Sequence, residues 1–113
     1  MALPPGVSLA SVAVNVDGVN EGLLNFVAHL GLIHQLLFSK PLVITSAKDA
    51  LHAAGSLHAE GKAVDVRTKD LLPDEQALLL HVLAYAGPSS DVATFDERAL
   101  LGQEHLHLEW HGK

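Results

Sequence analysis

The segment from residue 104 to residue 110 sets the strongest constraint on what this chain can fold into. Its apolar side chains alternate with polar ones: Leu106, Leu108 and Trp110 against His105, His107 and Glu109. Because neighbouring side chains on a strand point to opposite faces, the pattern predicts a strand with one apolar and one polar face. The apolar face needs other elements to cover it, and the polar face presents two imidazoles and a carboxylate.

Two segments with helical spacing can provide that cover. From Asn20, a typical N-cap residue, apolar side chains recur every three or four positions until Pro41 ends the pattern. A second such segment begins in the acidic stretch 70–75 and continues to Ala86. We therefore expect two helices on the apolar face of a sheet.

Four further segments are predicted to be extended: residues 11–17, as a short strand or an extended arm, and residues 42–45, 62–67 and 91–95, as strands. In the third of these, Ala63, Asp65 and Arg67 share the polar face if the two valines between them face the core. Residues 47–61 show no period and are interpreted as a long loop. We expect one domain over residues 1–113, in which residues 1–19 form an extended N-terminal arm or strand.

Composition excludes several classes of function. A net charge of −6 argues against nucleic acid as a partner, and no apolar stretch reaches the ~20 residues of a membrane span. The first residues lack the pattern of a secretory signal, so we expect a chain that is cytoplasmic as synthesised. There are 8 histidines and no cysteine, so any metal must be held by nitrogen and oxygen.

Three parts of the sequence can converge on the polar face: His58 at the end of a glycine-rich loop, Asp65, and the segment from Glu104 to His107. A catalytic zinc takes three protein ligands and leaves a fourth position open, and His58, Asp65 and His107 would supply that set. Glu104 would then lie over the open position as a general base. Strand alternation puts His105 on the same face as His107, so spacing alone does not choose between them.

These residues resemble a known family. Residues 55–65, GSLHAEGKAVD, match the motif Ser-x-His-x-x-Gly-x-Ala-x-Asp, and residues 104–107, EHLH, match an acidic residue followed by two variable residues and a histidine. Both motifs are typical of the D-alanyl-D-alanine carboxypeptidase family of zinc peptidases. Phage L-alanyl-D-glutamate endolysins, dipeptidases of vancomycin resistance and the zinc-bearing domain of hedgehog proteins belong to the same group.

The resemblance implies an α+β fold: a small antiparallel sheet with helices packed on one face and a zinc site on the other. It implies a zinc metallopeptidase that hydrolyses peptidoglycan stem peptides containing D-amino acids, as a carboxypeptidase or an endolysin-type endopeptidase. In it, His58, Asp65 and His107 bind Zn²⁺, and Glu104 is the general base for the attacking water. Ser56 is implied as a hydrogen-bond partner near the ligand loop or the substrate.

One departure from the family concerns substrate binding. Many members carry an arginine shortly after the Thr-Ser that closes the preceding strand, whereas this chain has Lys48 in that region. Lys48 or Arg67 is expected to take its place, and His52 and His105 are expected to line the cleft.

Two alternatives to a peptidase stay open. The chain could be a non-catalytic, zinc-stabilised binding domain, as the hedgehog resemblance allows, or a phage structural component. A phage-derived peptidase would have to be released to reach the cell wall.

Overall fold

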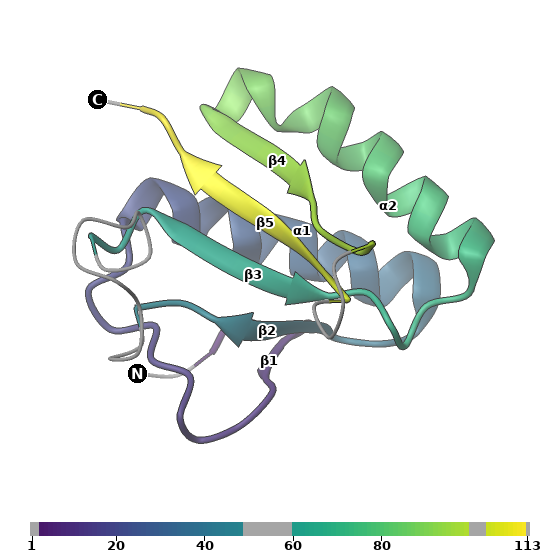
Figure 1. The fold of residues 1–113 in the computed structure, drawn as a ribbon, viewed down its shortest axis with the longest axis horizontal. Coiled ribbons are helices and arrows are strands. Elements are labelled where there is room, and N and C mark those ends of the chain that lie inside the picture. Colours follow the sequence, from purple (N-terminus) through teal and green to yellow (C-terminus); the bar gives the residue numbers. More distant parts are fainter. Residues whose placement is uncertain (1–2, 49–59, 100–103, 113) are drawn as a thin grey trace.

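The computed structural model describes residues 3–48, 60–99 and 104–112, and it shows an α+β arrangement of one sheet and two helices (Figure 1). The strands of the described part are β1 (Val7–Leu9), β2 (Leu42–Ser46), β3 (Ala63–Arg67), β4 (Val92–Asp96) and β5 (His105–Trp110). The helices are α1 (Glu21–Phe38) and α2 (Pro73–Ala86), and a short 3-10 turn (Pro88–Ser90) follows α2. The five strands lie in the order β1-β2-β3-β5-β4.

The sheet is mixed, which corrects the expectation of a purely antiparallel one. Strands β2, β3, β5 and β4 pair antiparallel, but β1 pairs parallel to β2, with Val7 opposite Leu42. Parallel neighbours need a crossover connection, and α1 provides it between these two strands. The three residues of β1 are too few to show a period in the sequence.

Both predicted helices are confirmed, and their ends have local causes. At the start of α1, the Asn20 side chain accepts a hydrogen bond from the Leu23 N–H at 3.1 Å. At its end, Ser39 adopts a left-handed conformation (φ 56°) and donates its N–H to the Gln35 carbonyl. Helix α2 begins at Pro73, a residue whose fixed φ suits the first helical position.

The strand predicted over residues 11–17 is wrong. Here side chains compete for the backbone N–H groups that a sheet would use: Ser11 Oγ accepts from Ala13, and Asn15 Oδ1 accepts from Asp17. The segment therefore turns instead of pairing. Two of its three valines are nonetheless buried, Val14 at 6% and Val16 at 7% exposure, whereas Val12 is exposed, so the alternation reports burial only in part and without a strand.

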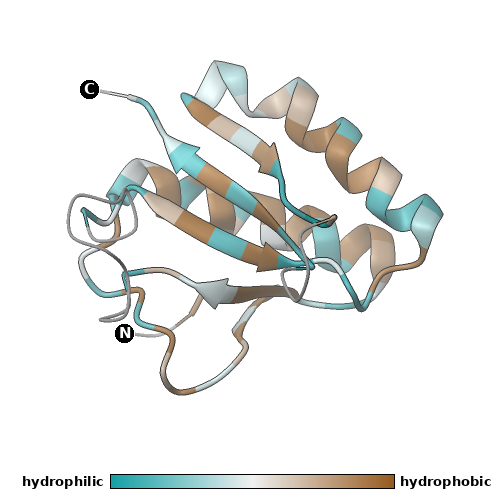
Figure 2. Ribbon diagram, viewed as in Figure 1, coloured by the Kyte–Doolittle hydropathy of each residue, from teal (hydrophilic) through white to brown (hydrophobic). Residues whose placement is uncertain are grey.

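The apolar face of the sheet and the two helices form one core. Leu106 and Leu108 of β5 are fully buried in the same cluster as Leu79 and Leu83 of α2 and as the apolar residues of α1. Figure 1 shows α1 crossing behind the sheet and α2 running along its β4 side. In Figure 2, hydrophilic and hydrophobic bands alternate along β3 and β5, as the sequence predicts. The polar face is thus the one that the helices leave uncovered.

Gly61, the glycine of the first family motif, has a conformational role just before β3. Its φ is +74°, and a Cβ at this position would collide with the carbonyl oxygen of Gly18. The Gly61 carbonyl also accepts a 2.7 Å hydrogen bond from the Asn20 N–H, at the start of α1. The motif glycine therefore joins the start of β3 to the start of α1.

We predict that Gly61→Ala lowers the free energy of unfolding by about 1–3 kcal/mol, because alanine is strained at this φ and has no room. Urea denaturation measures the change. The control is Glu60→Ala, which alters an exposed neighbour and should stay within about 0.5 kcal/mol of the parent. Equal stability of Gly61→Ala and the parent would contradict the role given to Gly61.

Candidate metal centre

Asp65 and His107 lie side by side at the middle of the polar face. They are 42 residues apart in the sequence but directly opposite each other in the antiparallel pairing of β3 and β5. The Asp65 Oδ1 and His107 Nδ1 atoms are 2.8 Å apart, and both side chains are about nine-tenths buried. The pairing of the two strands therefore brings together two of the three zinc ligands that the sequence suggests.

On its other side, His107 contacts a second carboxylate. Its Nε2 lies 2.8 Å from Glu109 Oε1, and Glu109 Oε2 lies 3.0 Å from His111 Nε2. The ring of Phe95, on β4, lies 5.9 Å from the His107 ring, centroid to centroid. The imidazole is thus held between two carboxylates, with an aromatic ring beside it.

A third carboxylate, Glu97, reaches the same face from just beyond β4. His105 Nε2 lies 2.7 Å from Glu97 Oε1 and 3.6 Å from Asp65 Oδ2. One donor atom from each of Asp65, Glu97 and His105 lies within 4.8 Å of the other two, so the group could bind a metal ion. Glu97 is not among the site residues predicted from the sequence, although extending the alternation of β4 two residues past Phe95 places it on this face.

The two carboxylates beside His107 change its protonation. Burial alone lowers the pKa of His107, but the hydrogen bonds and the negative charges of Asp65 and Glu109 outweigh it, so the pKa is raised above its usual 6.5. Without a metal, a proton on the imidazole neutralises part of the surrounding negative charge. The same carboxylates would attract a cation.

Histidines are the only partners that neutralise two of these carboxylates in the described part of the chain. Glu97 pairs with His105, and Glu109 pairs with His107 and His111, with no lysine or arginine within ion-pair distance of either. Histidine carries a charge only when it is protonated, so these two carboxylates lack a permanently charged partner among the described residues. A divalent cation could supply that charge.

The other residues predicted for the site either lie apart from the Asp65–His107 pair or fall outside the described residues. Glu104 lies directly before β5 with an exposed side chain, and its carbonyl accepts hydrogen bonds from the Thr68 N–H and Oγ1. Within the described ranges, the Glu104 carboxylate makes no hydrogen bond or ion pair with Asp65 or His107. His52, Ser56 and His58 lie outside the residues that the structure describes.

The two candidates for the substrate-orienting cation lie at opposite ends of the region. Arg67 is paired in register with His105, and its guanidinium lies 3.5 Å from Asp70 Oδ2. Lys48 follows β2, donates its N–H to the Asn15 carbonyl, and lays its side chain against Gly18. Arg67 is thus on a strand of the polar face, and Lys48 is packed against the N-terminal segment.

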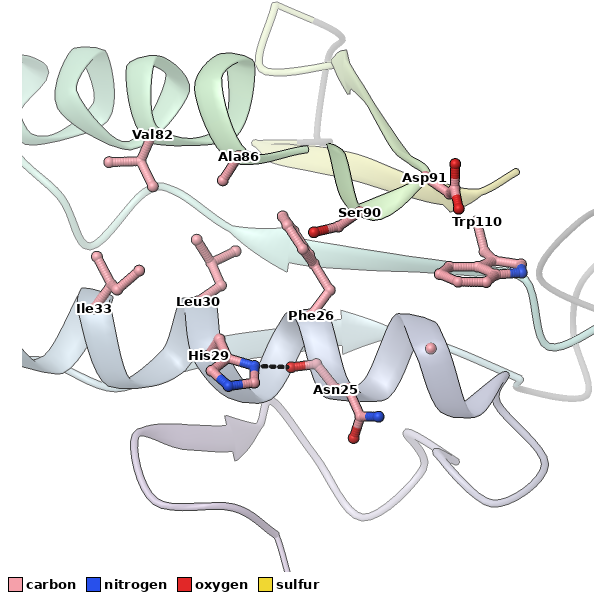
Figure 3. A pocket seen from close by; sticks show the side chains of 11 residues that line it. Asn25, Phe26, His29, Leu30, Ile33, Val82, Ala86, Ser90, Asp91 and Trp110 are labelled. Atoms are coloured by element: carbon pink, nitrogen blue, oxygen red, sulfur yellow. Dashed lines mark hydrogen bonds between the residues drawn. The ribbon is translucent and has the colours of Figure 1, made fainter. Parts of the chain in front are cut away.

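A separate cavity of about 410 Å³ lies between the two helices, on the opposite side of the sheet (Figure 3). Apolar side chains of both helices form most of its wall, among them Phe26, Leu30 and Val82. The imidazole of His29 at its rim hydrogen-bonds to the Asn25 carbonyl of its own helix. The polar cluster, which comprises Asp65, Glu97, His105, His107 and Glu109, does not line this cavity.

We predict that, in the metal-free protein, His107 titrates above 6.5 and that Glu109→Gln lowers its pKa. Because the folded pKa is the raised one, His107 contributes stability that is complete below about 6.5 and is lost as pH rises through the folded pKa. NMR titration of the imidazole signals in the presence of a chelator measures both values. The control is His111→Gln, which removes a contact of Glu109 but none of His107. An unchanged His107 pKa in Glu109→Gln would contradict the assignment.

The described part of the chain contains no helix with the length and apolar composition needed to cross a membrane. Comparison of the chain with protein-family models and with curated protein sequences found no match.

Proposed function

We propose that the protein is a zinc metallopeptidase that hydrolyses peptidoglycan stem peptides containing D-amino acids. The observation that carries the proposal is the 2.8 Å approach of Asp65 Oδ1 to His107 Nδ1. Each of the two motifs that resemble the D-alanyl-D-alanine carboxypeptidase family contributes one member of this pair. The register of β3 and β5 thus brings together one predicted ligand from each motif, as a shared metal site requires.

The donor atoms of this pair fit zinc. Zinc accepts imidazole nitrogen and carboxylate oxygen at about 2.0–2.2 Å, so two ligands of one tetrahedral ion lie about 3.3 Å apart. A widening of the Asp65–His107 contact by about half an ångström is enough to admit the ion. His58, in the other half of the first motif, would be the third protein ligand.

Glu109 supports His107 as a ligand. A metal-bound histidine usually donates its second ring N–H to a carboxylate, which fixes the tautomer and the ring orientation. Glu109 lies 2.8 Å from Nε2 and so can accept that proton, which leaves the Nδ1 lone pair directed toward Asp65 and the ion. Glu109 is therefore a positioning residue in the proposed site.

The chain's own residues would handle the proton of the reaction. When bound, zinc would supply Lewis acidity, polarising the scissile carbonyl and making water more acidic. Glu104, three residues before His107, would accept a proton from the attacking water and return it to the leaving amine. Its exposed position at the start of β5 leaves the carboxylate accessible to water and substrate.

Substrate orientation needs a cation for a peptide that carries free carboxylates. Arg67 lies on β3, the same strand as Asp65, and among the described residues its guanidinium forms an ion pair with Asp70 alone. A substrate carboxylate could displace that contact at little cost, because exposed ion pairs contribute about 0–1 kcal/mol. Lys48 is the second candidate, while Ser56, His52 and His105 would line the cleft.

We predict that the purified chain binds one zinc ion, held by His58, Asp65 and His107, and that His107→Ala abolishes this binding. His105→Ala should keep one zinc per chain, because the proposed ligand set does not include His105. Titration with zinc, followed by metal analysis, compares the two variants with the parent. Loss of zinc from His105→Ala as severe as that from His107→Ala would show that the ligand set is wrong.

We predict that Glu104→Gln keeps zinc and fold but loses at least about a hundredfold in the rate of hydrolysis of a D-alanine- or D-glutamate-containing stem peptide. The reason is that glutamine has the size of glutamate but cannot accept the proton. Glu21→Gln, at an exposed position in the first turn of α1, is the matched control, and it should hydrolyse the peptide at the parental rate.

Hydrolysis by Glu104→Gln at the parental rate, with zinc bound, would contradict the mechanism. A parent that binds zinc but hydrolyses no cell-wall peptide would favour the non-catalytic, zinc-stabilised domain. A parent that neither binds zinc nor hydrolyses would favour a structural component with a vestigial site.

A further inference from the structure

The two oxygens of Asp65 face different histidines. Oδ1 lies 2.8 Å from His107 Nδ1, and Oδ2 lies 3.6 Å from His105 Nε2. His105 is in turn 2.7 Å from Glu97 Oε1. A carboxylate whose two oxygens point to different nitrogen donors can hold a cation on each side, as in sites where two metal ions lie about 3.5–4 Å apart.

We propose a second divalent-cation site formed by Asp65, Glu97 and His105, beside the Asp65–His107 pair and distinct from it. Its donor atoms all lie within 4.8 Å of one another and come from β3, the residues after β4, and β5. The site stands on described residues alone and does not depend on zinc binding or peptide hydrolysis at the neighbouring position.

Burial and charge support a cation here. The side chains of His105 and Asp65 are 12% and 11% exposed, so water screens their charges poorly, while Glu97 is 33% exposed and leaves a route for an ion to enter. Two carboxylates face one imidazole in this group, an excess of acidic over basic side chains that a divalent ion would balance. The ion would keep water as its remaining ligands.

The donor set indicates the class of ion. Two carboxylate oxygens and one imidazole nitrogen suit a divalent first-row ion, because Mg²⁺ and Ca²⁺ favour oxygen ligands alone and copper(I) favours sulfur. Mn²⁺ accepts carboxylates readily and tolerates a histidine, and its paramagnetism reports binding directly. Mn²⁺ is therefore the appropriate probe.

A metal-free structural network is the competing reading. In it, His105 bridges Glu97 and Asp65, and the three side chains only stabilise the fold. The two cases differ in a measurable way, because only the cation site binds Mn²⁺ stoichiometrically and loses it when Glu97 loses its charge.

The experiment uses the full chain, stripped by a chelator, given one equivalent of zinc, and titrated with Mn²⁺ under electron paramagnetic resonance detection. We expect one Mn²⁺ per chain, bound at least about tenfold more weakly by Glu97→Gln and by His105→Gln. Glu109→Gln, the matched carboxylate-to-amide control, should bind Mn²⁺ within about threefold of the parent. Circular dichroism melting checks that each variant is folded.

A further variant keeps this inference separate from the proposed function. His107→Ala should still bind Mn²⁺ through Glu97 and His105, even though it loses zinc. Three results would overturn the second site: no Mn²⁺ binding by the parent, parental binding by Glu97→Gln, or loss of Mn²⁺ in His107→Ala but not in Glu97→Gln. The first of these would favour the metal-free structural network, and the last would place the ion at the neighbouring position.

Discussion

The antiparallel pairing of β3 with β5 is the interaction on which the rest of the structure depends. One register places Val66 opposite Leu106 and Val64 opposite Leu108 on the core face, and Asp65 opposite His107 on the polar face. A slip of one residue would send the leucines to solvent and the histidines into the core. The free energy of core burial therefore also fixes the geometry of the polar cluster.

Periodicity in the sequence predicted most of the elements and the two faces of the sheet. The helix that starts after Asn20 and the alternation of residues 104–110 are strong, local signals, and both are confirmed. The failures lie where the signal is weak: β1 is only three residues long, and Val14 and Val16 are buried in a segment that turns instead of forming a strand. The direction of β1 is set by the crossover of α1, which no local pattern encodes.

The sequence predicts which face of the sheet a side chain lies on more readily than which side chains on neighbouring strands touch each other. Alternation places Asp65, His105 and His107 on one face, but only the register decides which of them touch. Glu97 shows the limit most clearly, because it lies past the end of β4 and contacts a histidine eight residues away in the sequence. Whether Asp65 acts with His107 alone or with both histidines depends on the direction of its two oxygens, which no sequence pattern encodes.

Strand order has a kinetic consequence. β5 is an inner strand, between β3 and β4, yet it follows every other described element along the chain. A folding chain can form the β1–α1–β2 unit from nearby residues. Strand β4, however, is joined to β3 only through β5, which lies between them, so this side of the sheet cannot form until β5 inserts. Joining Asp65 to His107 closes a loop of about 40 residues, so contacts distant in sequence must form late and together. Folding should therefore be slow for a domain of this size, and a partly folded species should contain helix α1 without any of the cation-binding geometry.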